Sequence, residues 1–363
     1  MANMKNLFVK YPLITSFSPY ANTLSILGQN NKSLPWVLLN FIQLEYGFLN
    51  MSGTTLIDVN FYCPGGLNNF FHFCPYINVA CMEKTAVEAS LSEFVMKAID
   101  ENHYVYLNVD NYYIPYSQFF KKAHVPHSIM LFGYNTATKS FSYSDNLEGG
   151  KYGYSTCSFE ELNLSHASCA ANKMDEPDHS STSGLIYLLS INNDYEDTIT
   201  LGNMADKLEQ YLYPTASCSI PRLNYEVPIE HIKFGIGVYD FLSQYTVEWA
   251  RHDNYMDVFS KNFHVLHNHK LLLTEIGKVV SPVIDMGLVA ELYEIQQETE
   301  IIMNLYLKYR ITKNIDLLKK IEQKLSGLKQ KESDVLVDLR EALEAKREVS
   351  VCEFIPQPVR SFQ

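Results

Sequence analysis

The stretch HVPHSIMLFGYNTATKSFSYSDN, residues 124–146, has the pattern of a β-hairpin. An apolar run begins at His127, a polar turn NTATK follows, and an alternating run ends at Asp145. If Tyr134 pairs with Ser140 across the turn, His127 and Asp145 have the same parity. They then lie on one face as diagonal neighbours, about 7–8 Å apart at the backbone, a distance that their side chains can bridge.

An imidazole held by a carboxylate is two thirds of a nucleophilic catalytic triad, because the carboxylate fixes the tautomer and orientation of the ring. The same spacing also fits a surface histidine beside a turn aspartate. The hairpin alone does not separate these two interpretations, so the rest of the chain must supply a nucleophile.

Composition limits the class of protein. The chain has 363 residues, is 47% hydrophobic and carries a net charge of −12, which predicts a soluble globular protein and disfavours a general nucleic-acid binder. It has no apolar run of about 18 residues and no apparent secretion signal, so we expect no membrane partner and a cytoplasmic location. The seven cysteines are odd in number and lack a CxxC pair. They predict reduced thiols, with no metal and no cofactor.

The chain has two parts with different periodicity. Before residue 195 short strands alternate with helices, and after it the apolar spacing is helical. The first part predicts helices at 20–27 and 85–102, strands at 103–116 and 184–192, and a polar loop at 165–184. The second predicts helices at 197–213, 236–251, 257–280, 285–313 and 315–346.

These patterns predict an α+β protein with a front domain, 1–194, and an all-helical back domain, 195–363. Apolar residues on two rows of 315–346 predict that this helix forms an antiparallel hairpin with 285–313. The rows are Leu318, Leu325 and Leu339, and Ile321, Leu328 and Val335.

Residues 308–331 concentrate positive charge, with eight basic and two acidic side chains. Such a run is usually a solvated helix face. It could also be a docking surface for an acidic carrier protein, for which Lys319, Lys320 and Lys324 are the candidates.

The run from 104 to 146 resembles the butirosin-pathway acyltransferase family, whose members are papain-like enzymes. Similarity extends over about residues 10–190 and is weak in the helical part. The matching positions are Asp110 with Tyr112 and Tyr113, His127 with Gly133 and Tyr134, and Asp145. The resemblance implies a papain-like fold in the front domain. It also implies transfer of an acyl group from a carrier-protein thioester to an amine, through an acyl-enzyme on a cysteine.

The resemblance also suggests a substrate-binding set, namely Asp110, Tyr112, Tyr113 and Tyr134. A carboxylate beside aromatic faces attracts an ammonium ion, so these residues could bind a small amine or diamine acceptor. A strand-end turn with packed tyrosines would have the same sequence.

The nucleophile is the point at which the chain departs from the family. No cysteine precedes Cys63, and the expected slot at the start of the first helix falls on Ala21. Three explanations stay open: an engineered replacement, a natural inactive protein, or a nucleophile elsewhere. Ser18, Cys63, Cys74 and Cys81 are the candidates for the last.

We therefore expect a Cys-His-Asp-type amide synthetase of antibiotic biosynthesis, with Ala21 in the cysteine position and with His127 and Asp145 as the other members. The alternatives are a papain-like cysteine peptidase and a catalytically inactive binding module of the same fold.

Overall fold

The computed structural model describes residues 3–29, 31–51, 54–63, 66–87, 90–171, 184–214, 232–249 and 256–355. The chain divides into two compact units. Unit 1 consists of Met1–Asn30 and Leu67–Tyr195, and unit 2 consists of Asn31–Gly66 and Glu196–Gln363. The prediction has one boundary, between residues 194 and 195, whereas the chain passes between the units after Asn30, Gly66 and Tyr195. The segment from 31 to 66 was predicted to belong to the front domain and instead belongs to unit 2.

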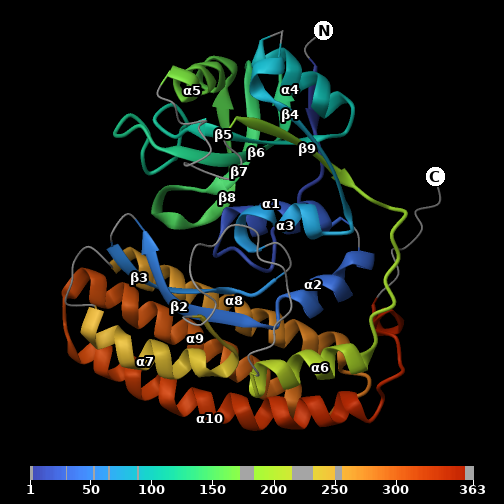
Figure 1. Ribbon diagram of the computed structural model, residues 1–363, viewed down its shortest axis with the longest axis vertical. Coiled ribbons are helices and arrows are strands. Elements are labelled where there is room, and N and C mark those ends of the chain that lie inside the picture. Colours follow the sequence, from blue (N-terminus) through green and yellow to red (C-terminus); the bar gives the residue numbers. More distant parts are fainter. Residues whose placement is uncertain are drawn as a thin grey trace. The chain divides into compact units, whose positions relative to one another are not determined.

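Unit 1 is built on an antiparallel sheet with the strand order β4-β9-β5-β6-β7-β8 (Figure 1). Its strands are β1 (Met4–Asn6), β4 (Ile77–Glu83), β5 (Tyr104–Asp110), β6 (Pro126–Asn135), β7 (Ser140–Asn146), β8 (Tyr152–Ser158) and β9 (Leu185–Ile191). Strand β1 pairs with β6. The strand predicted at 184–192 is confirmed as β9. The strand predicted at 103–116 ends at Asp110, since hydrogen-bonded turns follow it.

The helices of unit 1 are α1 (Ser18–Leu27), α3 (Gly66–Phe73), α4 (Leu91–Asp100) and α5 (Phe159–Ala171). Helices α4 and α5 pack on the sheet around a core of aliphatic and aromatic side chains. The helix predicted at 85–102 begins only at residue 91, because the Ser90 side chain accepts a hydrogen bond from the Glu93 N–H and caps α4 there.

Helix α5 occupies part of the segment predicted to be a polar loop, 165–184. Its start is a capping box in which the Ser158 hydroxyl accepts from the Glu161 N–H and the Glu161 carboxylate accepts from the Ser158 N–H. This local signal outweighs the polar composition up to Ala171. Residues 172–183 lie outside the described part of the chain.

The β6–β7 hairpin exists, but its turn is one residue shorter than predicted. Asn135 pairs with Ser140, and Tyr134 pairs with Phe141. A bulge between Leu131 and Gly133 then shifts the register by one residue, so that Met130 pairs with Ser144. This is the register that the predicted Tyr134–Ser140 pair would have given at the far end of the strands. The shorter turn and the bulge shift the register by one residue in opposite directions. His127 and Asp145 therefore lie in the predicted register.

Unit 2 is not all-helical. It contains an antiparallel sheet of order β10-β2-β3, formed by β2 (Leu44–Met51), β3 (Thr54–Phe61) and β10 (Ile232–Phe234). Because β2 pairs with β10 and β3 packs against helix α8, the segment 31–66 is joined to the helical unit by backbone hydrogen bonds and side-chain packing.

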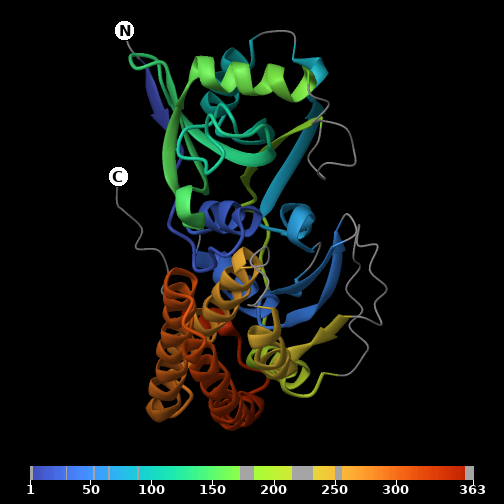
Figure 2. The same ribbon diagram turned by 90° about the vertical axis from the view of Figure 1, so that its left-hand side faces the viewer.

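The remaining elements of unit 2 are helical, which confirms a helical C-terminal region. They are α2 (Leu34–Asn40), α6 (Leu201–Leu212), α7 (Val238–Trp249), α8 (Met256–Val280), α9 (Met286–Thr312) and α10 (Asp316–Glu344). Helix α9 lies beside both α8 and α10 (Figure 2). The two predicted apolar rows of α10 are buried, as the hairpin prediction requires.

Candidate active site

The imidazole of His127 and the carboxylate of Asp145 meet at one end of the unit 1 sheet. Nε2 of His127 lies 2.8 Å from Oδ1 of Asp145. The Asp145 side chain is 4% exposed, whereas that of His127 is 37% exposed. Nδ1 of His127 has no hydrogen-bond partner among the described residues. The predicted contact is therefore present, and it leaves one ring nitrogen available to a substrate.

The charge state of this pair follows from two opposing effects. Burial lowers the pKa of His127, but the negative charge of Asp145 and the hydrogen bond to it outweigh burial, so the pKa is raised above its usual value. A histidine of this kind accepts a proton readily and keeps it close to a carboxylate. That behaviour suits a general base whose imidazolium form must be stabilised.

Ala21 lies in α1 and is fully buried. The residue after it, Asn22, joins α1 to the sheet, because its Oδ1 accepts hydrogen bonds from Ser144 Oγ at 2.7 Å and from Tyr152 OH at 3.0 Å. Ser144 immediately precedes Asp145. The helix that carries the expected nucleophile slot is thus anchored one residue away from the carboxylate, but the slot holds only a methyl group.

Asn22 is a candidate that the sequence analysis missed. Its side chain is 1% exposed, and its Nδ2 is a buried donor without a hydrogen-bond partner. A buried unpaired donor costs about 1–3 kcal/mol, so natural proteins rarely keep one without a use. Its position directly after the expected nucleophile slot was the available signal.

Three cysteines of unit 1, Cys74, Cys81 and Cys157, are poor substitutes for a nucleophile beside His127. Burial raises the pKa of both Cys74 and Cys157 to about 12, which keeps these thiols protonated and unreactive. Cys63 is also buried, and Cys81 is exposed on β4. Strand β4 is separated from β6 by β9 and β5, so Cys81 is about 14 Å away across the sheet.

Ser18, the other candidate nucleophile, is the first residue of α1 and is buried, with 4% of its surface exposed.

Asp110 is not placed to bind an ammonium ion directly, which corrects the predicted amine pocket. Its carboxylate is fully buried and already accepts three hydrogen bonds. The donors are the Tyr112 N–H at 3.0 Å, His124 Nδ1 at 2.6 Å and Ser168 Oγ at 2.5 Å. A second histidine–aspartate pair, His124–Asp110, therefore exists in unit 1.

The three tyrosines of the predicted pocket lie in different environments. Tyr112 stacks on the His124 ring, with centroids 4.3 Å apart, and Tyr113 packs edge-on against Tyr112. Both are half-buried. Tyr134 is buried and donates to Asp100 in α4 at 2.7 Å, so it is a core residue and not a substrate contact.

The basic run on α10 is largely neutralised. Lys319 pairs with Asp316 at 3.1 Å, and Lys324 pairs with Glu298 at 2.7 Å. Lys320 is exposed. Other lysines of the run pair with acidic side chains on α7 and α9, namely Lys329 with Asp240 and Lys331 with Glu294. This pairing favours a solvated helix face over a docking surface.

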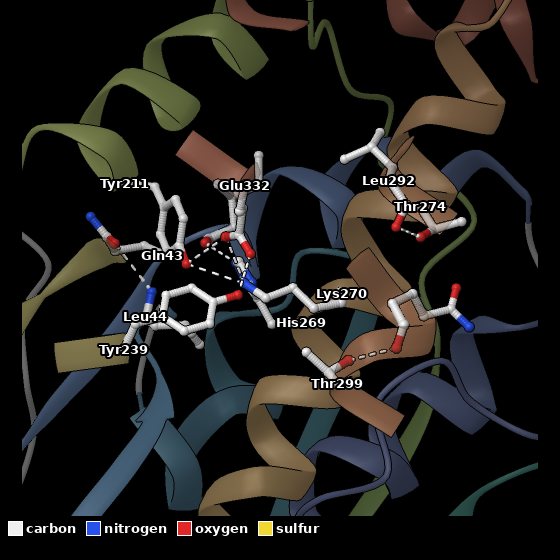
Figure 3. Close-up of polar contacts among 12 residues, drawn as sticks. Gln43, Leu44, Tyr211, Tyr239, His269, Lys270, Thr274, Leu292, Thr299 and Glu332 are labelled. Carbon is white, nitrogen blue, oxygen red and sulfur yellow. Dashed lines mark hydrogen bonds and ion pairs between the residues drawn. The ribbon is translucent and has the colours of Figure 1, made fainter. Parts of the chain in front are cut away.

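Unit 2 holds a buried polar cluster that the sequence did not reveal (Figure 3). Lys270 and Glu332 are fully buried and form an ion pair with an Nζ–Oε1 distance of 2.6 Å. Tyr211 and Tyr239 donate their hydroxyls to the two carboxylate oxygens of Glu332. The Lys270 ammonium lies 5.4 Å and 5.1 Å from the centroids of the Tyr211 and Tyr239 rings, respectively.

His269 completes this cluster. Its Nε2 donates to the Ile42 carbonyl at 2.7 Å, and its Nδ1 accepts from Lys270 Nζ at 2.8 Å. Burial and the Lys270 charge hold the pKa of His269 well below its usual value. The cluster links α6, α7, α8 and α10 in a site closed to solvent, so it stabilises the packing of unit 2 and offers no surface to a substrate.

No known family model matches the sequence, and no curated protein is significantly similar to it. None of the helices in the described part combines the length and apolar character needed to cross a membrane. Within that part, no three His, Cys, Asp or Glu side chains gather closely enough to hold a metal ion.

Proposed function

We propose that this protein is a papain-like acyltransferase that moves an acyl group from a carrier-protein thioester to an amine. The observation that carries the proposal is the His127–Asp145 contact, 2.8 Å long, in which a buried carboxylate orients a partly exposed imidazole. The order of residues 21, 127 and 145 and the packing of α1 on the sheet support a papain-like arrangement.

The chain carries alanine at position 21, so we propose direct transfer without an acyl-enzyme. The amine nitrogen forms a C–N bond with the thioester carbonyl carbon, and its proton passes to Nδ1 of His127. The C–S bond then breaks, and the leaving thiolate takes that proton. Asp145 stabilises the imidazolium formed between these steps, in the manner of a triad carboxylate.

Asn22 holds α1 against the sheet beside this pair, because its Oδ1 accepts hydrogen bonds from Ser144 and Tyr152. Its Nδ2 is buried, so it does not contact a substrate directly.

A second candidate is a catalytically inactive binding module. The fully buried methyl group of Ala21 favours it, because a protein that has lost its nucleophile can retain the surrounding side chains for binding. The acyltransferase should form amide product, whereas the inactive binding module should not. A peptidase is disfavoured because burial keeps the Cys74 and Cys157 thiols protonated and Cys81 lies on β4, which β9 and β5 separate from β6.

The test is amide formation from an acyl phosphopantetheinyl carrier protein and a primary amine, followed by mass spectrometry. We expect the wild-type chain to form amide and His127→Gln to lose about 10²–10⁴-fold in rate. His72→Gln, a change at an exposed histidine of α3, is the matched control and should keep the wild-type rate. Binding of the acyl carrier without turnover would favour the inactive module, and wild-type turnover by His127→Gln would overturn the proposed role of this residue.

A further inference from the structure

His124 is positioned like a second catalytic histidine. Its Nδ1 lies 2.6 Å from Oδ2 of Asp110, and its side chain is 46% exposed while that of Asp110 is fully buried. Because an ionised carboxylate can only accept, this contact places the proton on Nδ1. The lone pair is then on Nε2, which has no partner among the described residues.

The buried carboxylate of Asp110 is surrounded by hydrogen-bond donors. Besides His124, the Tyr112 N–H and the Ser168 hydroxyl donate to its two oxygens. Ser165, one turn earlier in α5, accepts from the Asp110 N–H at 2.7 Å and donates to the Asp110 carbonyl at 3.0 Å. Three donors therefore satisfy the oxygens of this buried side chain. Among the described polar partners of this carboxylate, the His124 ring alone reaches solvent substantially.

The two histidine–aspartate pairs lie at the same end of the sheet. Asp110 pairs with Pro126 in the β5–β6 ladder, and Val109 pairs with His127. Adjacent strands are about 4.8 Å apart, so the backbones of Asp110 and His127 are near neighbours, and Val109 is the residue of β5 whose side chain shares the face of His127. Tyr112 stacks flat on His124 and fixes the plane of its ring.

The proposed reaction needs two proton acceptors. A primary amine with a pKa near that of lysine, about 10.4, is an ammonium ion at neutral pH and has no lone pair for attack. It must lose one proton to become a nucleophile and a second when the amide forms. His127 returns the second proton to the leaving thiolate. The first proton needs a separate base.

We propose that the His124–Asp110 pair is this base, and that the acceptor is a primary amine which enters as an ammonium ion beside Tyr112. The inference rests on the proposed acyl transfer. Nε2 of His124 takes one N–H proton from the ammonium ion, the N–H bonding pair becomes the nitrogen lone pair, and the imidazolium passes its proton to water. Asp110 acts through His124 and does not touch the amine.

A structural role for the pair is the competing explanation. Residues 111–125 form a loop whose ends are joined by a hydrogen bond from the Asn111 N–H to the Val125 carbonyl, and His124–Asp110 could simply hold its base together. A purely structural contact would affect every acceptor equally. A base for an ammonium ion would affect only acceptors that arrive charged.

The experiment compares two acceptors with the full-length protein and one acyl carrier thioester at pH 7. The first is n-butylamine, which is an ammonium ion at this pH, and the second is methoxyamine, which is neutral. We expect His124→Gln to lower kcat/KM for n-butylamine by about 100-fold and for methoxyamine by less than about 2-fold. The n-butylamine defect should shrink as the pH rises towards the pKa of that amine.

The other variants separate the two proposals. His127→Gln should slow both acceptors, and His72→Gln should slow neither. If His124→Gln lowers kcat/KM equally for both acceptors, the pair has a structural role. That result would overturn the inference while leaving the acyl transfer intact. Absence of amide from the wild-type chain with either acceptor, or full activity in His127→Gln, would overturn the proposed function itself.

Discussion

Nε2 of His127 lies 2.8 Å from Oδ1 of Asp145, and although burial lowers the pKa of the ring, the charge of this carboxylate and the hydrogen bond to it together raise the pKa. Asp145→Asn removes the charge but keeps the burial and the side-chain volume. We therefore expect the pKa of His127 to fall below its usual value of about 6.5 in this variant. Titration of the ring protons by NMR measures it, and an unchanged pKa would mean that Asp145 does not control the histidine.

The same contact contributes pH-dependent stability. Because the folded pKa of His127 is raised, the contribution is fully present below about pH 6.5 and is lost as the pH rises through the folded value. Asp145→Asn should therefore destabilise the protein more at pH 6 than at pH 8. Urea unfolding at the two pH values tests this. A larger loss of stability at pH 8 than at pH 6 would contradict the predicted direction of the pH dependence.

His269 should act in the opposite direction. Its pKa is held well below the usual value, so the folded protein keeps the ring neutral while the unfolded chain binds a proton below about pH 6.5. Stability should therefore decrease as the pH falls below that value, and His269→Gln should flatten this part of the stability profile. A profile unchanged by the substitution would show that His269 is not responsible.

The buried ion pair of unit 2 should be costly to break. Glu332→Gln leaves the Lys270 charge in a closed site without its partner, and such changes destabilise proteins by about 3–5 kcal/mol. The matched control is Asp316→Asn, which removes an exposed partner of Lys319 and should cost less than about 1 kcal/mol. Denaturant unfolding measures both, and similar costs would mean that the cluster is not closed to water.

Two glycines of unit 2 give a further contrast. Gly235 has φ +73°, and a Cβ there would lie 2.2 Å from the Tyr211 carbonyl oxygen, so Gly235→Ala should destabilise unit 2 by more than about 1 kcal/mol. Gly327 lies inside α10 with open space around it. Gly327→Ala should therefore stabilise by up to about 1 kcal/mol. Thermal unfolding tests both signs, and a neutral Gly235→Ala would contradict the close approach.

The long helices could be predicted from sequence because each repeats the apolar spacing over many turns. The prediction of 257–280 differs from α8 by a single residue. Strand β10 has only three residues and exists because Ile232–Phe234 pairs with β2, nearly 190 positions earlier in the sequence. Local pattern carries no information about such a partner, so the strand and the membership of 31–66 in unit 2 were both missed.

The candidate site shows the same limit. His127 and Asp145 could be paired from sequence because one hairpin holds both. Asp110 could be noticed beside its tyrosines, but its burial depends on Ser165 and Ser168, more than 50 positions later. A carboxylate that binds an amine was therefore expected where the fold makes a buried one. His124 lies in the hairpin stretch of the sequence. It became a candidate only because the fold buries Asp110 and pairs it with the His124 ring.

The most direct test of the account is a single-turnover, rapid-quench reaction of the wild-type chain with an acyl carrier thioester and n-butylamine. Amide product and the intact mass of the protein are measured at each time point. With Ala21 in place and His127 as the base, amide should accumulate while the protein mass stays unchanged. An acyl adduct that forms and decays at the rate of amide formation would contradict direct transfer and would place a nucleophile on another residue.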